Sequence, residues 1–371
     1  MTNTRPADSV RLAEVAEEAG VSLSTISKVL NGRSDVSRRT RVRVEELLER
    51  SGYQRQRKVR ANTPLIELVF HELDAVWSME IIRGVESAAR EFGMNIVLSE
   101  SGTRHAPGTE WIEGAMRRRP TGVVLVFSDL PAEQRNQLQS RSIPFAIVDP
   151  AGDPSPDVPS VGSANWAGGL MATRHLVDLG HRRIAAITGP ADMMCSLARV
   201  DGYRSALGSA GIPIDESLIR YGDFHVDGGR DNALALLTRP DRPTAIFAGS
   251  DLQALGVFDA ARTMNLRVPE DISVVGYDDI PLARWASPAL TTVHQPLYEM
   301  GREACRIVVA LSRNEIDEVP RMDLSTSLIV RSSTMALTEH TMAPSATALA
   351  EHTTVPSATT LAEHTTVPAE Q

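Results

Sequence analysis

Apolar residues near the start of the chain recur with the spacing of one helical face. In the stretch LAEVAEEAG, residues 12–20, the large and small apolar positions are Leu12, Val15, Ala16 and Ala19. Their spacing predicts an amphipathic helix. Gly20 marks the end of this helix, because glycine enters the left-handed conformation that closes a helix at little cost.

Two further helices are predicted directly after the first. Ser22 and Ser24 are good caps for the start of a second helix, which the pair Asn31-Gly32 ends. Ser37 caps a third helix, SRRTRVRVEELLERSG. The apolar positions that face inward are Ile26, Val29, Leu30, Val44, Leu47 and Leu48. Two short helices joined by a glycine-containing turn form a helix-turn-helix, whose second helix enters the DNA major groove. A plain three-helix bundle is the alternative, but the small uncharged polar residues on the outer face favour DNA.

After residue 64 the pattern changes to short β-branched runs separated by helical periods. Strands are predicted at 65–70, 95–100, 122–128, 144–149, 183–189, 244–250 and 272–279, and helices at 79–93 and 251–265 among others. A Pro/Gly-rich stretch at 152–160 separates the first four strands from the rest. Uninterrupted apolar strands that alternate with helices indicate an α/β body with two lobes, each built on a parallel sheet. Ligands of such sheets bind beyond the carboxyl ends of the strands, here in the cleft between the lobes.

The last part of the chain is a repeat with a period of 12 residues. Its copies begin at Leu337, Leu349 and Leu361, and each contains EHT followed by a proline. The copies have few large apolar side chains, so we expect this tail to be disordered. One histidine recurs in each copy, which leaves a weak metal-binding role open. The remaining histidines are scattered and predict no metal site.

The head and the body of the chain carry opposite charge. Residues 1–62 hold 13 Lys and Arg against 8 Asp and Glu, a net charge of +5. The whole chain carries −9, which leaves −14 for the other residues. A basic head on an acidic body indicates a polyanionic partner for the head alone.

Several classes of protein are disfavoured by what the sequence lacks. No apolar run reaches the roughly 18 residues of a membrane helix, and no secretory signal is visible, so a cytoplasmic location is expected. Cys195 and Cys305 fit a reducing compartment, and a buried or pocket-lining thiol is favoured over a catalytic one. The chain has no GxGxxG after its first strand, no P-loop and no GxSxG, so we expect neither an enzyme nor a cofactor.

Together these motifs resemble the LacI/GalR family of bacterial transcription regulators. The resemblance is carried in the head by VRLAEVAEEAGVSLSTISKVLNG and SRRTRVRVEELLERSGY. In the body it is carried by ITGP, RVDGYRSAL, FAGSDLQALG, VPEDISVVGYDDI and LTTVHQP, in family order. It implies a body like the periplasmic sugar-binding proteins, which dimerises and closes on a small effector.

The resemblance also implies roles for residues of the head and the linker. Leu23, Ser24 and Lys28 match family positions that read base edges. The positions that match phosphate contacts or helix placement are Ser22, Thr25, Ser27 and Asn31. Linker candidates for DNA contact are Tyr53, Arg55, Arg57 and Lys58. Asn62 stands where family members commonly have a leucine that wedges into the minor groove, so the basic linker is expected to follow phosphates or a narrow A·T minor groove instead.

For the body the resemblance implies a set of effector contacts. Arg199 and Asp251 match a pair of contacts that suits vicinal sugar hydroxyls, with a structural salt bridge between them as the alternative. Trp77 and Phe224 match aromatic positions that stack on sugar rings. Further candidates that line the cleft are Ser128, Asp149, Cys195, Asp278 and Trp285. Met193 and Cys195 stand where purine-binding members have polar contacts, which leaves a mono- or disaccharide as the expected effector.

These inferences predict a repressor of carbohydrate-use genes that binds a palindromic operator as a homodimer and is released by a sugar. A ligand-dependent activator or a corepressed regulator stays open, because the sequence does not fix the sign of the response. A sugar-binding transport protein is a distant alternative. The expected divisions are a helix-turn-helix domain at 1–52, a basic linker at 53–63, the two-lobed effector-binding and dimerisation domain at 64–335 and the tail at 336–371.

Overall fold

The computed structural model of the chain describes residues 14–30, 36–50, 64–73, 76–102, 108–126, 130–316 and 318–337. It divides into two units, Met1–Thr63 and Pro64–Gln371. Several predicted positions lie outside the described residues: Asn31, Tyr53, Arg55, Arg57, Lys58, Asn62, Ser128 and the tail from 338 onward.

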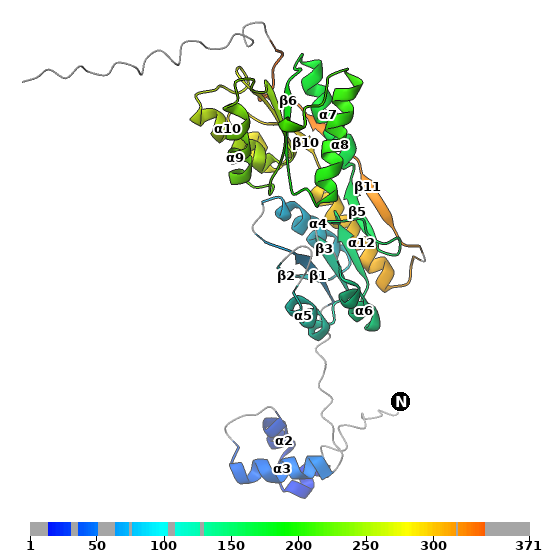
Figure 1. Cartoon of the computed structure of the whole chain (residues 1–371). Coiled ribbons are helices and arrows are strands. Elements are labelled where there is room, and N and C mark those ends of the chain that lie inside the picture. The colour runs from blue at the N-terminus through cyan, green and yellow to red at the C-terminus, as the bar shows by residue number, and fades with distance from the viewer. Residues whose placement is uncertain are drawn as a thin grey trace, which may run out of the picture. The chain divides into compact units, whose positions relative to one another are not determined.

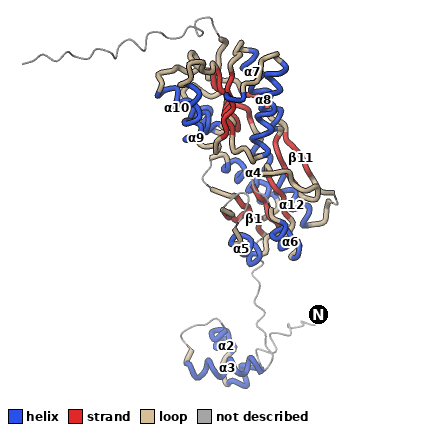
Figure 2. The backbone as a smooth tube through the Cα atoms, in the orientation of Figure 1, coloured by secondary structure: helices blue, strands red, loops and turns tan. Residues whose placement is uncertain are grey.

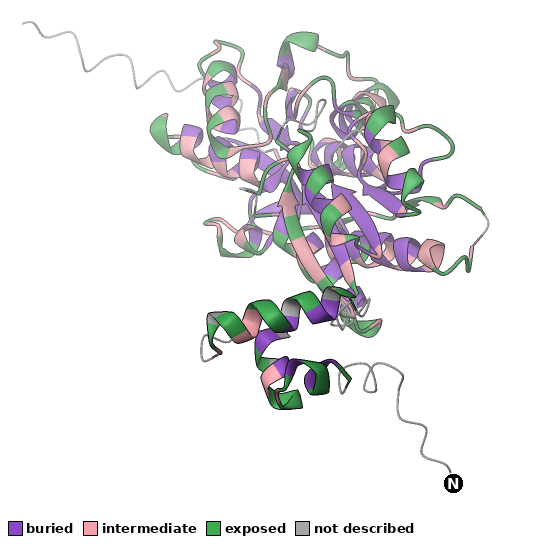
Figure 3. Cartoon of the chain, turned by 90° about the horizontal axis from the view of Figure 1, so that it is seen from below, coloured by how far each residue is buried: buried purple, intermediate pink, exposed green. Residues whose placement is uncertain are grey.

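The first unit contains the three predicted helices. Residues 14–19 are helical, and α2 (Leu23–Leu30) and α3 (Arg38–Arg50) follow. Ser22 caps α2 by accepting a hydrogen bond from the Thr25 N–H at 3.2 Å, and Ser37 caps α3 in the same way through the Thr40 N–H. The buried core consists of Val15, Ala16, Ala19, Ile26, Val29, Val44, Leu47 and Leu48. Figure 3 shows these helices with their buried residues in purple.

The first lobe of the body is a parallel sheet with helices on both faces (Figures 1 and 2). Its strands, in spatial order, are β11 (Arg321–Leu324), β5 (Ser160–Ser163), β4 (Phe145–Val148), β3 (Gly122–Val126), β1 (Leu65–Phe70) and β2 (Asn95–Glu100). Alternate residues along β1 face opposite sides. Leu68 packs with α4 (Ser78–Glu91) and α12 (Leu297–Ser312), whereas Val69 packs with α5 (Glu110–Arg118) and α6 (Ala132–Ser140).

The second lobe repeats this plan with an antiparallel strand at one edge. Its strands, in spatial order, are β12 (Ser327–Ile329), β10 (Thr291–His294), β9 (Ser273–Asp278), β8 (Ala245–Ala248), β6 (Ile184–Thr188) and β7 (Ile219–Tyr221). Only β12 runs antiparallel to its neighbour in this sheet. One face carries α7 (Asn165–Asp178) and α8 (Met194–Ser209), and the other carries α9 (Val226–Leu237) and α10 (Asp251–Thr263). The one-turn helices η1 (Glu216–Leu218) and α11 (Pro281–Trp285) lie in connections.

The chain passes between the lobes three times. The passages lie between β5 and α7, between β10 and α12, and between β11 and β12. The first and third passages are joined where the Ala164 N–H donates to the Leu324 carbonyl at 2.9 Å. A further bond between the lobes runs from the Met194 N–H to the Ala151 carbonyl at 2.9 Å. The two lobes are therefore joined by three short passages rather than by one link.

Each of three helix pairs in the body packs through a glycine on both partners. Gly84 and Gly301 lie in the α4–α12 contact, where a Cβ on Gly84 would overlap the Tyr298 carbonyl. The corresponding pairs are Gly169 with Gly202 between α7 and α8, and Gly229 with Gly256 between α9 and α10. In every case the added Cβ would meet backbone atoms of the facing helix. The body therefore depends on close backbone contact between paired helices.

The predicted strands are present, and the structure adds five more. The added strands β5, β7, β10, β11 and β12 are three or four residues long and include sequences such as SVGS and RMDL. Such strands lack the apolar run on which the prediction depended. Packing of the body also continues to the end of the described residues, since the Leu337 N–H donates to the Leu179 carbonyl at 2.8 Å.

Candidate functional site

The outer face of α2 presents the side chains that the sequence assigned to base contacts. Leu23 is 53% exposed, and Ser24 and Lys28 are also exposed. Ile26 and Val29 of the same helix are buried in the head core. An apolar, a hydroxyl and a cationic group therefore share one accessible helix surface, as direct contact with base edges in a major groove requires.

Ser22, which directly precedes α2, and Thr25 in its first turn carry two further hydroxyls that hold the start of the helix. The Ser22 hydroxyl lies 2.7 Å from the Ser24 hydroxyl and 3.0 Å from that of Thr25. Ser22 therefore caps the N-terminus of α2. Because its side chain is also exposed, it remains accessible to a DNA phosphate. The first helix is tied to α3, because Arg43 donates to the Glu18 carbonyl and Arg50 pairs with the Glu18 carboxylate at 3.3 Å.

In the body, a buried arginine forms the centre of the candidate effector site. Arg199 lies in the second turn of α8 and is 3% exposed. Its guanidinium donates to the Asn165 side chain at 2.8 Å, to the Gly249 carbonyl at 2.5 Å and to Gln295 at 3.2 Å. It also lies 3.7 Å from the centre of the Tyr277 ring. These contacts fix the plane of the guanidinium, which has five N–H groups and therefore keeps donor capacity for a ligand.

Two buried carboxylates lie near this guanidinium. Burial raises the pKa of Asp149 to about 6, while Arg199 and the Asn165 amide act in the opposite direction. Burial likewise raises the pKa of Asp278 to about 7, against the lowering effect of Arg199. Both residues end parallel strands and have positive φ, 48° for Asp149 and 109° for Asp278. Non-glycine residues in such conformations cluster at ligand sites, where the surrounding fold holds them.

Apolar side chains from both lobes pack against one extended buried cluster of the body. Trp77 from the first lobe and Phe224 from the second both contact one buried cluster, which includes Met193 and Cys195. The Phe224 ring centre lies 5.5 Å from the Arg199 guanidinium carbon. Burial raises the pKa of the Cys195 thiol to about 12, so this thiol is neutral at physiological pH. Aromatic faces beside fixed donors and acceptors suit a ligand with both C–H faces and hydroxyls.

The Asp251 carboxylate, which the sequence paired with Arg199 as an effector contact, bonds to other parts of the second lobe. It accepts from the Thr292 hydroxyl at 2.5 Å and from the Ile280 N–H at 2.8 Å, and the residue is fully buried. Both oxygens are engaged in joining α10 to β10 and to the segment after β9. The bonds of the Asp251 carboxylate are therefore structural ones in this molecule, and no described ion pair joins it to Arg199. Burial, then the Asp278 carboxylate, raises its pKa well above the usual range.

Two residues that hold Arg199 were missed in the sequence. Asn165 is the first residue of α7, directly after a passage between the lobes, and Gln295 lies at the second passage. Gln295 is part of the LTTVHQP motif, so the motif itself was a usable signal. Asn165 follows the short strand β5, which the sequence did not predict, and gave no such signal.

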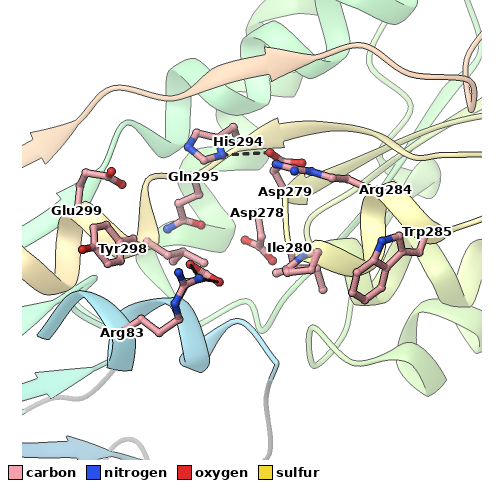
Figure 4. Close-up of a pocket in the computed structure, with 13 residues that line it drawn as sticks. Arg83, Asp278, Asp279, Ile280, Arg284, Trp285, His294, Gln295, Tyr298 and Glu299 are labelled. Atoms are coloured by element: carbon pink, nitrogen blue, oxygen red, sulfur yellow. Dashed lines mark hydrogen bonds and ion pairs between the residues drawn. The ribbon is translucent and has the colours of Figure 1, made fainter. Parts of the chain in front are cut away.

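Trp285 lies apart from this group, at the rim of a hollow between the lobes. It is 77% exposed on α11. The hollow has a volume of about 330 Å³, and Figure 4 shows Arg83 of α4 and Trp285 on opposite sides with Asp278 between them. Asp279 is held by Arg331 at 2.5 Å and by His294 at 3.2 Å. Asp278 therefore borders both the Arg199 region and this hollow, and Asp279 lines the hollow as well while Arg331 and His294 hold it in place.

The described residues contain no group of three or more His, Cys, Asp or Glu side chains arranged to hold a metal ion. No helix among them has both the length and the apolar character needed to cross a membrane.

Comparison with known proteins identifies both parts of the chain. Residues 11–56 match the family described as bacterial regulatory proteins, lacI family, and residues 173–334 match a periplasmic binding protein-like domain. The chain is 38% identical over 337 residues to the HTH-type transcriptional regulator CelR of Thermobifida fusca, spanning 87% of this chain and 97% of CelR. It is 34% identical to the ribose operon repressor of Escherichia coli, spanning 87% and 99% of the two chains. The chain belongs to the LacI family.

Solved structures of LacI-family regulators share this fold. A CelR–cellobiose complex superposes with a TM-score of 0.66 at 36% identity, over 89% of this chain and all of that one. A lac repressor dimer bound to operator and the anti-inducer ONPF gives 0.65 at 28% identity, over 88% and 99% of the two chains. The helix-turn-helix head and the periplasmic-binding-protein-like body are confirmed. As a LacI-family protein the chain is a DNA-binding transcription regulator and belongs to a non-enzymatic family.

Proposed function

We propose that this regulator is a homodimeric repressor of carbohydrate-utilisation genes, active in the cytoplasm. It binds a palindromic operator through the outer face of α2 and leaves it when a mono- or disaccharide occupies the cleft of the body. The curated relatives include a ribose operon repressor, and one similar structure is a complex with cellobiose. Both support a sugar as the class of effector.

The observation that carries the proposal is the setting of Arg199. A sugar offers hydroxyls that both donate and accept, and C–H faces that pack on aromatic rings. Arg199 supplies fixed donors, Asp149 and Asp278 supply acceptors, and Phe224 and Trp77 supply aromatic faces from opposite lobes. A purine would need polar contacts at Met193 and Cys195, where this chain has buried apolar side chains.

Sugar contacts on both lobes would couple sugar binding to DNA affinity through the angle between the lobes. A ligand held by Trp77 on one lobe and Arg199 on the other favours one angle between the lobes. It shifts DNA affinity by the difference between its affinities for the two forms of the protein. In a homodimer, this angle would set the spacing of two heads that must match the half-sites of an operator.

Anisotropy of fluorescent DNA with the purified full chain tests the proposal. The DNA is the region upstream of its own gene and of neighbouring sugar genes, and a panel of mono- and disaccharides includes ribose and cellobiose. We expect tight binding to an inverted repeat, weakened at least tenfold by one sugar. A log–log salt slope of about −5 to −9 fits about 6 to 10 phosphate contacts.

Other outcomes select the alternatives. Binding that a sugar strengthens would make the protein a corepressed regulator, and bound DNA with raised transcription would make it an activator. Sugar binding with no sequence-selective DNA binding would leave only the distant alternative of a sugar-binding transport protein, and the proposal would be wrong.

A further inference from the structure

The hollow beside Trp285 adjoins the effector site through two shared side chains. Asp278 and Gln295 both line the hollow, whose volume is about 330 Å³. Gln295 also accepts a hydrogen bond from the Arg199 guanidinium at 3.2 Å. The volume is at the lower end of the range for small-molecule pockets, about 300–1,000 Å³. A ligand that reaches Arg199 and extends past Asp278 would therefore place one further small group in this hollow.

The Asp278 carboxylate keeps hydrogen-bond capacity at the wall of the hollow. The residue is 9% exposed, and Figure 4 shows it between Arg83 and Trp285. It accepts from the Asp251 backbone N–H. No described ion pair neutralises it, because the Arg199 guanidinium donates to other groups. A carboxylate has about four acceptor positions, so this one can also accept from a ligand hydroxyl.

The charged groups around the hollow indicate the kind of ligand. Arg83 and Glu80 neutralise each other at 2.8 Å. Arg284 and Glu299 line the hollow, are exposed, and have no ion pair among the described residues. A hydroxyl both donates and accepts, so it can bond to a guanidinium as well as to a carboxylate. Unpaired groups of both signs therefore suit a neutral polyhydroxyl group better than a cation or an anion.

Aromatic side chains from both lobes border the hollow. Trp285, on α11 of the second lobe, is 77% exposed. Tyr298, on α12 of the first lobe, is half-buried, and its ring centre lies 6.0 Å from the Arg83 guanidinium carbon. An aromatic face can pack on the C–H face of a sugar ring. The hollow therefore combines aromatic faces with bonding groups for hydroxyls, as the Arg199 region does.

The backbone that carries Trp285 is anchored in the second lobe. Asp251 accepts from the Ile280 N–H at 2.8 Å, directly before α11. Ala283 of α11 is fully buried, and its carbonyl accepts from the Leu290 N–H at 2.8 Å. Binding costs less when the contacting segment is already ordered. The exposed Trp285 ring thus extends from a fixed segment, which favours contact with a ligand in the hollow.

We propose that this hollow is a second sugar subsite and that the effector of the regulator is a disaccharide. Its first ring lies at Arg199, and its second ring packs on Trp285 with hydroxyls bonded to Asp278 and Arg284. The inference rests on the proposed sugar function and narrows its class of effector from any small sugar to one with two rings. Trp285 is the residue that distinguishes two rings from one, because only the second ring reaches it.

Calorimetric titration of the full chain tests the subsite by comparing disaccharides with the monosaccharides from which they are built. The disaccharides are cellobiose, lactose, maltose and sucrose, and the single sugars are glucose, galactose, fructose and ribose. We expect one disaccharide to bind at least about tenfold more tightly than any single sugar, because its second ring adds the contact with Trp285. Trp285→Ala should weaken its binding at least about tenfold and change monosaccharide binding less than about twofold. Trp285→Phe, which keeps an aromatic face, should retain most of the preference.

The matched control is Trp166→Ala, because Trp166 is an exposed tryptophan of the same lobe that does not line the hollow, and both affinities should stay unchanged. A single sugar that binds as tightly as every disaccharide would overturn the subsite and leave the proposed function intact. Equal weakening of single sugars and disaccharides by Trp285→Ala, or equal effects of the two alanine variants, would overturn it as well. If no sugar of the panel binds, the proposed function fails together with the subsite.

Discussion

The head and the body carry their functional side chains in opposite ways. In the head, Leu23, Ser24 and Lys28 stand exposed on one helix, within six residues of sequence, over a core of eight apolar side chains. In the body, Trp77, Arg199 and Gln295 come from distant parts of the chain, and Arg199 and Gln295 are buried. Recognition in the head is therefore local and exposed, whereas recognition in the body exists only once the lobes have formed.

The largest difference between an effect on sugar affinity and an effect on operator affinity is expected for a substitution at Arg199. Arg199→Lys keeps the charge but removes the guanidinium plane that bonds Asn165, Gly249 and Gln295. Sugar affinity should fall at least about 100-fold, because hydrogen bonds to charged groups contribute about 1.5–3 kcal/mol each. Operator affinity without sugar should change less than about threefold. Calorimetry and anisotropy measure the two affinities, with Arg204→Lys on the same helix as control.

A packing change should act on the body and leave the head intact. Gly84→Ala places a Cβ against the Tyr298 carbonyl, so the body should lose about 1–3 kcal/mol of stability, as overpacked cores do. Gly208→Ala, in α8, meets nothing within 4 Å and should stabilise by about 0.4–1 kcal/mol. Denaturation followed by circular dichroism compares the two. Equal effects of both variants would show that the close contact of α4 and α12 is not required.

A substitution on α2 should change operator affinity without changing sugar affinity. Lys28→Ala should reduce operator affinity by about 1–3 kcal/mol if Lys28 contacts a base, and relax preference at one base pair of each half-site. Sugar affinity should stay unchanged. Lys28→Arg, which keeps the positive charge, is the control. Binding to a panel of operators with single substitutions checks the result, and a uniform loss across the panel would make Lys28 a phosphate contact.

A pH-dependent effect is expected from the buried carboxylate Asp278. Its folded-state pKa of about 7 lies above the unfolded value, so its contribution to stability is full below about pH 4 and is lost as pH rises through 7. Asp278→Asn should therefore stabilise the body at pH 8, where the buried carboxylate is ionised, by up to about 1.4 kcal/mol for each unit by which folding raises its pKa. The difference should shrink toward pH 4. Thermal unfolding across this range measures it, and a difference independent of pH would contradict the burial argument.

The same contrast explains how far the sequence predicts the structure. The head could be derived almost completely, because its caps Ser22 and Ser37 and its apolar spacing are local signals. The long apolar strands of the body were predicted for the same reason. The short strands β5 and β11 were missed, because a sequence such as SVGS becomes a strand only when a neighbouring strand pairs with it.

The candidate effector site could be predicted only in part. Arg199 and Asp278 were found from family motifs, and the structure places both in one region. Asp251 lies one residue after Ser250, the cap of α10, and the motif alone could not show that its carboxylate turns inward to Thr292. Asn165 was missed because its importance depends on a passage between lobes that has no sequence signal.

The central claim is that the cleft of the body and the operator surface of the head are coupled. Titration of the sugar into the free protein and into the protein saturated with operator DNA tests it most directly, by comparing the two dissociation constants. The account predicts weaker sugar binding to the DNA complex, by the same factor of at least ten by which the sugar weakens DNA binding. Equal sugar affinity in the two states would contradict it.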